Sequence, residues 1–101
     1  MSEPKTFEAA LDQKLAECRR VMIAKQLDYG PGNISSWGEI GVAVRLTDKV
    51  ERLRNLLMSG RKPENESIRD TALDIANYGL ILMELLDKQW GLPMEAQTHG
   101  R

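Results

Sequence analysis

The chain has 101 residues, with 14 Lys plus Arg against 15 Asp plus Glu, so its formal net charge is −1 and its length suits one small globular domain. This balance gives no overall attraction to nucleic acid, and no apolar run approaches the roughly 20 residues of a membrane-spanning helix. The single cysteine excludes an internal disulfide, and the first residues lack the apolar segment of a secretion signal. We therefore expect a soluble, cytoplasmic protein that binds neither nucleic acid nor membrane.

The first predicted helix covers residues 5–27. Its apolar residues repeat at intervals of three and four, as in an amphipathic helix: Phe7, Leu11, Leu15, Cys18 and Met22. Residues 28–33 follow with the sequence DYGPGN, whose glycines, proline and asparagine favour turns. The pattern predicts that the helix ends there and that a glycine-rich loop, able to receive a nucleoside, comes next.

The second predicted helix covers residues 37–58. Ser36 and Glu39 have the spacing of a capping box, which predicts its start. Gly60 is the expected C-terminal cap, because glycine tolerates the left-handed conformation found there. The expected buried seam consists of residues spaced by three and four: Ala43, Leu46, Val50, Leu53 and Leu57.

The third predicted helix has its long helical segment from Glu66 to Leu86, with Asn65 as the expected N-cap. It stops around Trp90, because Gly91 comes next. Short connections between three helices make neighbouring helices antiparallel. The sequence thus predicts an all-α, antiparallel three-helix domain over residues 1–91, followed by a C-terminal tail over residues 92–101.

Two helices carry charged strips that suit phosphate chemistry. The acidic strip on the third helix consists of residues spaced by four, four and three: Glu66, Asp70, Asp74 and Asn77. On the second helix, the mainly basic strip lies within about 100° of the helix surface and consists of Arg45, Asp48, Lys49 and Arg52. Guanidinium and ammonium groups bind phosphate, and carboxylates can hold Mg²⁺ between themselves and phosphate oxygens. The two strips predict a site for attack by water on a nucleotide phosphate.

Both strips point away from the predicted apolar seams, so in an isolated three-helix domain they would face water. The broad apolar arc of the third helix predicts that a second subunit packs on it and encloses a cleft. We therefore expect a helical-bundle homo-oligomer, either a dimer or a tetramer.

Three blocks, in order, resemble the phage and bacterial nucleotide modification associated domain: residues 25–30 (KQLDYG), 45–53 (RLTDKVERL) and 70–78 (DTALDIANY). More remotely, the chain is similar to the all-α nucleoside triphosphate pyrophosphohydrolases of the MazG and dimeric dUTPase type. This resemblance implies a MazG-like fold. It also implies Mg²⁺-dependent hydrolysis of a nucleoside triphosphate, a deoxynucleotide or modified nucleotide, to the monophosphate and pyrophosphate in phage nucleotide metabolism.

The wider group carries Glu-Glu-x-x-Glu on one helix and Glu-x-x-Asp on the next, with an Asn seven residues after the Asp. Asp70 and Asn77 match the second motif, whereas Ser67 stands at its glutamate and bases stand at two of the three acids of the first motif. Through this resemblance, the expected catalytic residues are Asp48, Glu51, Asp70 and Asp74. Of these, Asp48, Asp70 and Asp74 are the expected metal ligands. The expected substrate-binding residues are Lys25, Asp28 and Tyr29 at the nucleoside, Arg45, Lys49 and Arg52 at the phosphates, and Asn77.

Two other interpretations stay open. The altered acidic motif is compatible with a non-catalytic module that binds nucleotides or regulates another protein. The charges are also compatible with surface ion pairs on a purely structural helical oligomer, since exposed helix faces are normally charged.

Overall fold

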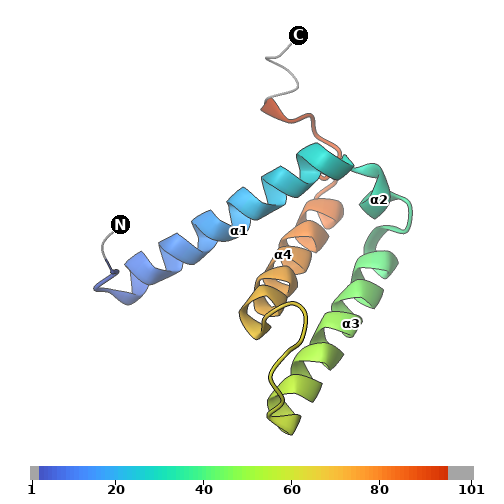
Figure 1. The fold of residues 1–101 in the computed structure, drawn as a ribbon. Helices are drawn as coiled ribbons and strands as arrows, with labels where there is room; N and C mark the ends of the chain where they lie inside the picture. The colour runs from blue at the N-terminus through green and yellow to red at the C-terminus, as the bar shows by residue number, and fades with distance from the viewer. Residues whose placement is uncertain (1–2, 96–101) are drawn as a thin grey trace. The chain divides into compact units, whose positions relative to one another are not determined.

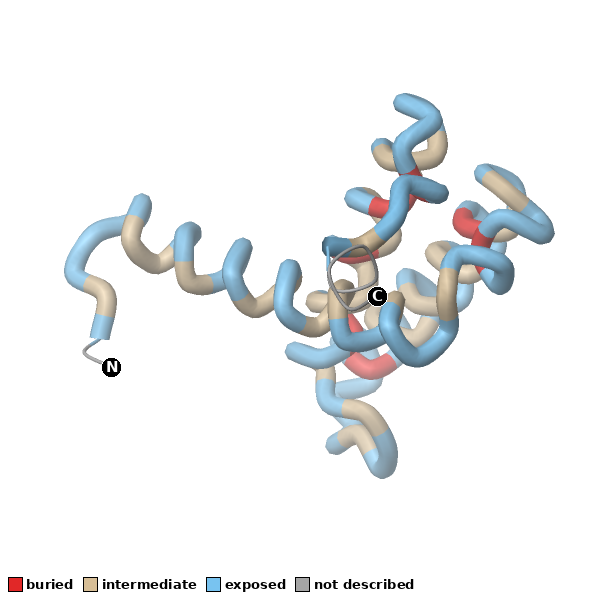
Figure 2. Tube along the Cα trace, turned by 90° about the horizontal axis from the view of Figure 1, so that it is seen from above, coloured by how far each residue is buried: buried red, intermediate tan, exposed pale blue. Residues whose placement is uncertain are grey.

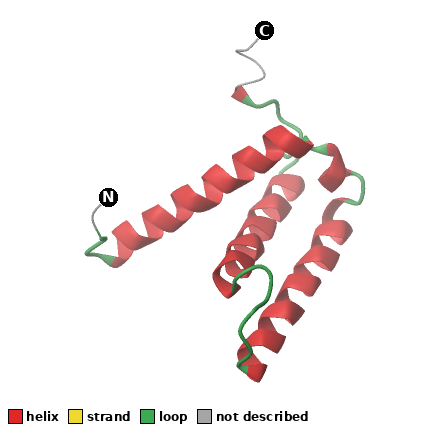
Figure 3. Ribbon diagram, in the orientation of Figure 1, coloured by secondary structure: helices red, strands yellow, loops and turns green. Residues whose placement is uncertain are grey.

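The computed structural model describes residues 3–95, and this part of the chain is helical and contains no strand (Figure 3). The described helices are α1 (Phe7–Tyr29), α2 (Gly32–Ser35), α3 (Gly38–Ser59) and α4 (Ile68–Leu86) (Figure 1). The prediction of an all-α chain is confirmed. The contacts divide the chain after Gly30, so residues 3–30 and 31–95 form two compact units that are described separately. The single domain over residues 1–91 stays a prediction, and residues 96–101 of the predicted tail lie outside the described residues.

Helix α1 forms the first unit. It begins after Thr6, whose Oγ1 accepts a hydrogen bond of 3.1 Å from the Ala9 amide. It continues through Asp28 and Tyr29, which were predicted to lie in a loop. The helix stops at Gly30, where φ is +70° and the amide donates to the Gln26 carbonyl oxygen over 2.8 Å. The turn-forming residues therefore end the helix two residues later than predicted.

The second unit opens with a helix that the sequence did not predict. Helix α2 is a single turn held by the Pro31 carbonyl oxygen, which accepts from the Ser35 amide at 2.9 Å. Its Ile34 side chain is buried. Ser36 closes this turn by donating from Oγ to the Gly32 carbonyl oxygen over 2.7 Å. The predicted capping box is therefore wrong: α3 begins after Trp37, and no side chain caps it.

Helix α3 ends as predicted, whereas α4 begins later and ends earlier than the predicted stop near Trp90. Gly60 caps α3 in the left-handed conformation, at φ +70° and ψ +8°, and its amide donates to the Leu56 carbonyl oxygen over 3.1 Å. The N-cap of α4 is Ser67 instead of the predicted Asn65, because the Ser67 Oγ accepts from the Asp70 amide at 3.0 Å. Glu66 consequently precedes the helix.

Helices α3 and α4 pack side by side through faces that the hydrophobic pattern did not predict (Figures 1 and 2). Val42 and Leu56 are buried on α3, whereas Val50 and Leu57 of the predicted seam are 44% and 61% exposed. The buried residues of α4 are Thr71, Asn77 and Ile81. The apolar arc of α3 is wide, and the flank that meets α4 carries the basic strip. The aliphatic stems of lysine and arginine can pack there while their charged ends reach polar partners. The prediction that the charged strips face water within one chain is therefore wrong for the residues of the strips that meet between α3 and α4, whereas Asp48 and Asp70 are exposed.

Trp90, which follows α4, is hydrogen-bonded to the first residue of the second unit. Trp90 is 9% exposed, and its indole Nε1 donates to the Pro31 carbonyl oxygen over 3.1 Å. This bond joins residues 59 positions apart. Among the described helices, none is both long enough and apolar enough to cross a membrane.

The N-cap of α4 gives a stability prediction. Replacing Ser67 with alanine should lower the free energy of unfolding by about 1 kcal/mol, because an amide at the helix start loses its acceptor. Urea denaturation of the full chain measures this change. Ser67→Asp should retain most of the stability. The matched control is Ser35→Ala, whose side chain is exposed at the end of α2 and which should change the free energy by less than about 0.5 kcal/mol.

Candidate functional site

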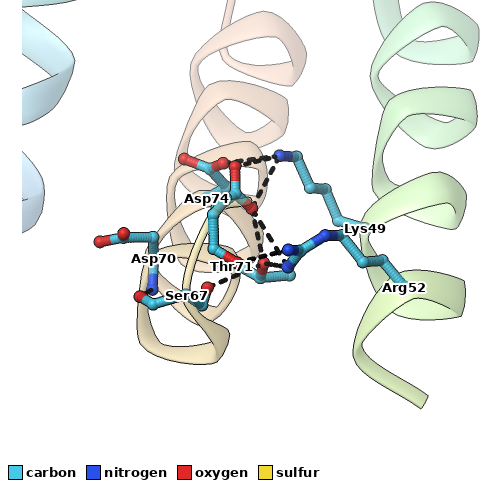
Figure 4. A network of polar contacts seen from close by, with 7 residues as sticks. Lys49, Arg52, Ser67, Asp70, Thr71 and Asp74 are labelled. Carbon is cyan, nitrogen blue, oxygen red and sulfur yellow. Dashed lines mark hydrogen bonds and ion pairs between the residues drawn. The ribbon is translucent and has the colours of Figure 1, made fainter. Parts of the chain in front are cut away.

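The candidate site lies where two cations of α3 meet the beginning of α4. Lys49 and Arg52, three residues apart on α3, have side chains that are 25% and 28% exposed. Facing them are Glu66, just before α4, and Thr71 and Asp74 in its first two turns. We call these five residues the α3–α4 cluster (Figure 4).

Lys49 lies between two carboxylates. Its Nζ donates to Glu66 Oε1 and Oε2 over 3.0 and 3.1 Å, and it forms an ion pair with Asp74 Oδ2 at 2.8 Å. The Asp74 side chain is only 17% exposed, and that of Glu66 is 30% exposed. Two negative groups from different turns of the chain therefore converge on one ammonium group.

Arg52 binds the same segment through its guanidinium group. Nη1 donates to Thr71 Oγ1 over 2.6 Å, Nη2 donates to the Glu66 carbonyl oxygen, and Nη1 lies 3.8 Å from Glu66 Oε2. Thr71 is fully buried, and its hydroxyl lies 2.5 Å from Glu66 Oε2 and 3.2 Å from the Ser67 carbonyl oxygen. A hydroxyl has one hydrogen, so it donates to one of these two oxygens at a time. Thr71 thus connects the arginine to the chain that leads into α4.

These contacts change the protonation equilibria of two members. The hydrogen bond to Asp74 is the main reason why the pKa of Lys49 is raised, Glu66 adds to the effect, and partial burial opposes it. The pKa of Glu66 is lowered, chiefly by the Thr71 hydroxyl and then by Lys49. Both shifts favour the charged forms, so the pair of Lys49 and Glu66 is held in its ionised state.

The structure brings together three of the predicted site residues: Lys49, Arg52 and Asp74. Asp70 is exposed, and its carboxylate points away from α3 (Figure 4). Asp48 and Glu51 are exposed on α3, where Glu51 pairs with Arg54 at 2.8 Å. The three predicted metal ligands are therefore not gathered at one point.

The remaining predicted residues lie outside the cluster. Arg45 is directed to the α2 region, where its Nη2 donates to the Asn33 carbonyl oxygen over 3.3 Å. Asn77 is buried on α4, at 7% exposure. Lys25, Asp28 and Tyr29 lie in the last two turns of α1 and belong to the other unit. The roles of all these residues stay predictions.

The donor set limits how the cluster could hold a metal ion. Within residues 3–95, no three Asp, Glu, His or Cys side chains form a group suited to a metal ion. Glu66 and Asp74 nevertheless converge on one cation, the Lys49 ammonium. Mg²⁺ is commonly bound by one or two carboxylates, with phosphate oxygens and water completing its shell. The residues fit Mg²⁺ in that form only, together with a phosphate ligand.

Sequence reasoning did not identify Thr71 as a member of the site. A threonine inside a helix usually hydrogen-bonds its own backbone, as Thr47 does to the Ala43 carbonyl oxygen at 2.9 Å. Nothing in the sequence distinguishes Thr71 from Thr47. The nearest signal is its spacing of three residues from Asp74, which places both on one helix face.

Thr71 supplies a test of the cluster. Thr71→Val keeps the shape of the side chain but removes the hydroxyl that Arg52 and Glu66 share, so the free energy of unfolding should fall by about 1–3 kcal/mol. Thr71→Ser, which keeps the hydroxyl, should lose less. Thr47→Val is the matched control and should be near neutral. Equal effects of the valine substitutions in thermal denaturation would contradict the role given to Thr71.

The lowered pKa of Glu66 gives a pH prediction. Its stabilising contribution is fully present above the unfolded pKa, about 4.5, and is lost as the pH falls through the lower pKa of the folded state. The stability difference between the wild type and Glu66→Gln should therefore shrink with acidification. Urea denaturation across this range measures it. Lys49→Met should weaken the pH dependence without abolishing it, because the Thr71 hydroxyl still lowers the pKa of Glu66.

Comparison with known families gives one assignment. Residues 25–85, more than half of the chain, match the family described as nucleotide modification associated domain 1. Neither the comparison with curated proteins nor that with solved structures gives a match. The matched range contains α3, nearly all of α4 and every member of the α3–α4 cluster. The chain therefore belongs to the nucleotide modification associated domain 1 family.

Proposed function

We propose that the protein hydrolyses a nucleoside triphosphate, a deoxynucleotide or modified nucleotide, to the monophosphate and pyrophosphate in an Mg²⁺-dependent reaction of phage nucleotide metabolism. The observation that carries this proposal is the α3–α4 cluster, in which two cations of the kinds that bind phosphate meet two carboxylates on one partly exposed face. Membership of a family associated with nucleotide modification agrees with a nucleotide ligand. The remote relation to MazG-type enzymes is part of the proposal.

In this mechanism, phosphate oxygens replace carboxylates as partners of the α3 cations. The Arg52 fork suits two phosphate oxygens, and Lys49 contributes a point charge. Both side chains are accessible enough for exchange, at 25% and 28% exposure. Arg45 would extend the phosphate contacts and Asn77 would orient a carboxylate or the ligand. Lys25, Asp28 and Tyr29 are proposed to border the nucleoside.

Release of Lys49 leaves the Glu66 and Asp74 carboxylates available for another cation. Asp74 is the proposed principal holder of Mg²⁺, together with Asp70 once the Asp70 side chain turns from the direction seen in Figure 4, and Asp48 or Glu51 would assist. When bound with the nucleotide, Mg²⁺ would neutralise charge that develops on the phosphate oxygens. The contribution of the protein is mainly to position the phosphates and to balance charge.

A second candidate is a non-catalytic module that binds nucleotides or regulates a partner. The donor set favours it, because no group of three metal-binding side chains occurs in residues 3–95. Lys49 and Arg52 would then bind phosphate without hydrolysis.

The two candidates are separated by incubating the full chain with a panel of nucleoside triphosphates and Mg²⁺ and measuring pyrophosphate. We expect release with at least one nucleotide and a loss of about a hundredfold or more in Lys49→Met and Asp74→Asn. Asp70→Asn tests the predicted metal ligand, and unchanged turnover would remove Asp70 from the mechanism. Glu64→Gln, on the exposed connection before α4, is the control expected to keep activity. No pyrophosphate, combined with a nucleotide-dependent rise in melting temperature, would support the non-catalytic module instead.

We also propose that the protein is a homo-oligomer. Exposed apolar side chains on α4 support this, since Met83 and Leu86 are 60% and 63% exposed. Covering such side chains is favourable in a chain of this size, which buries little surface by itself.

A further inference from the structure

One row of side chains on α4 repeats at intervals of four, three, four, three and four residues: Arg69, Leu73, Ala76, Leu80, Met83 and Asp87. This is the spacing of a coiled-coil seam. The row lies about 150° around the helix from the residues that meet α3, at 100° per residue. Leu80 and Met83 are 38% and 60% exposed, and Arg69, Ala76 and Asp87 are also exposed. Helix α4 therefore has one face directed at α3 and a partly exposed row on nearly the opposite side.

The row is symmetric about Tyr78. Arg69 and Asp87 are each nine residues from it, and Ala76 and Leu80 are each two residues from it. The remaining two residues, Leu73 and Met83, are each five residues from Tyr78. In an antiparallel pair of identical helices related by a two-fold axis, residue i meets residue j and residue j meets residue i. The row would then place opposite charges together at both ends and a small side chain against a large one near the centre.

The end charges fit a neighbouring helix better than their own. Arg69 is in the first turn of α4 and Asp87 is its C-cap. A helix has a partial positive charge at its N-terminus and a partial negative charge at its C-terminus, so each of these residues is unfavourably placed on its own helix. Beside an antiparallel copy, Arg69 lies at the C-terminal end of the other helix and Asp87 at its N-terminal end. Both interactions then become favourable.

We propose that the partner of this face is a second copy of the same chain, bound through antiparallel α4–α4 packing centred near Tyr78. This inference rests on the proposed self-association but not on nucleotide hydrolysis. Because the α3–α4 cluster lies on the other side of α4, the pairing leaves each cluster composed of residues from one chain. The second subunit thus covers the apolar row and does not close the charged site.

The end charges allow a specific test. Arg69 and Asp87 are 18 residues apart, about 27 Å along a helix, so they cannot pair within one α4. Arg69→Asp or Asp87→Arg alone puts like charges together twice in a two-fold dimer. We expect each to weaken self-association of the full chain by about tenfold or more in sedimentation equilibrium. The double variant restores opposite charges and should recover the wild-type association.

Two controls exclude trivial causes. Asp87→Arg improves the charge arrangement of its own helix, so the melting temperature of the dilute chain should not fall in this variant. Arg61→Asp reverses an exposed charge that pairs with Glu64 at 3.0 Å in the connection before α4, and it should leave association unchanged.

A wild-type chain that stays monomeric at all concentrations would overturn both this inference and the proposed oligomer. A dimer that ignores the single reversals, or that the double variant does not rescue, would overturn the antiparallel arrangement alone. Pyrophosphate release is measured independently of either result, so failure of the nucleotide hypothesis is recognised separately.

Discussion

The contact between Lys49 and the two carboxylates of Glu66 and Asp74 determines how α3 and α4 meet. The buried apolar side chains of residues 3–95 are few: Ile34, Val42, Leu56, Ile81 and Trp90. Between the apolar contacts of α3, at Val42 and Leu56, lie the basic residues that bind the beginning of α4. Half-exposed ion pairs each contribute modestly to stability, but loss of one member leaves the others incompletely paired. The polar network therefore contributes more to the choice of the helix faces that pack together than to the stability of the helix pair.

Helix periods and stop signals predicted much of the fold. Gly60 ended α3 as expected, because a glycine cap acts locally, whereas α4 ended at Leu86, before the stop predicted near Trp90. The rotation of α3 was predicted wrongly for a physical reason. Its apolar arc is wide enough that either flank could pack, and only the partners across the interface decide between them. Ser36 shows a similar limit, since the same hydroxyl can cap a following helix or close a preceding turn.

The candidate site was predicted in part. Lys49, Arg52 and Asp74 were expected, and they meet. Glu66 was assigned to the helix but lies before it, and this position allows both its side chain and its carbonyl oxygen to reach α3. Asp70 matched a family motif yet points away from the cluster. A motif fixes spacing along the chain, whereas the direction of each side chain depends on where the helix begins and how it is turned.

The present contacts and the proposed chemistry use the same groups, and this has a thermodynamic consequence within the proposed function. A phosphate that takes Lys49 from Glu66 and Asp74 leaves two carboxylates without their cation, which raises their affinity for Mg²⁺. Conversely, a divalent cation at those carboxylates releases Lys49 for phosphate. Linkage makes such effects reciprocal, so phosphate and metal binding should each strengthen the other. Antiparallel pairing of α4 is compatible with this exchange, because it covers the far side of the helix and leaves the cluster accessible. In that arrangement the apolar row holds two copies together, and α3 remains able to change its partners.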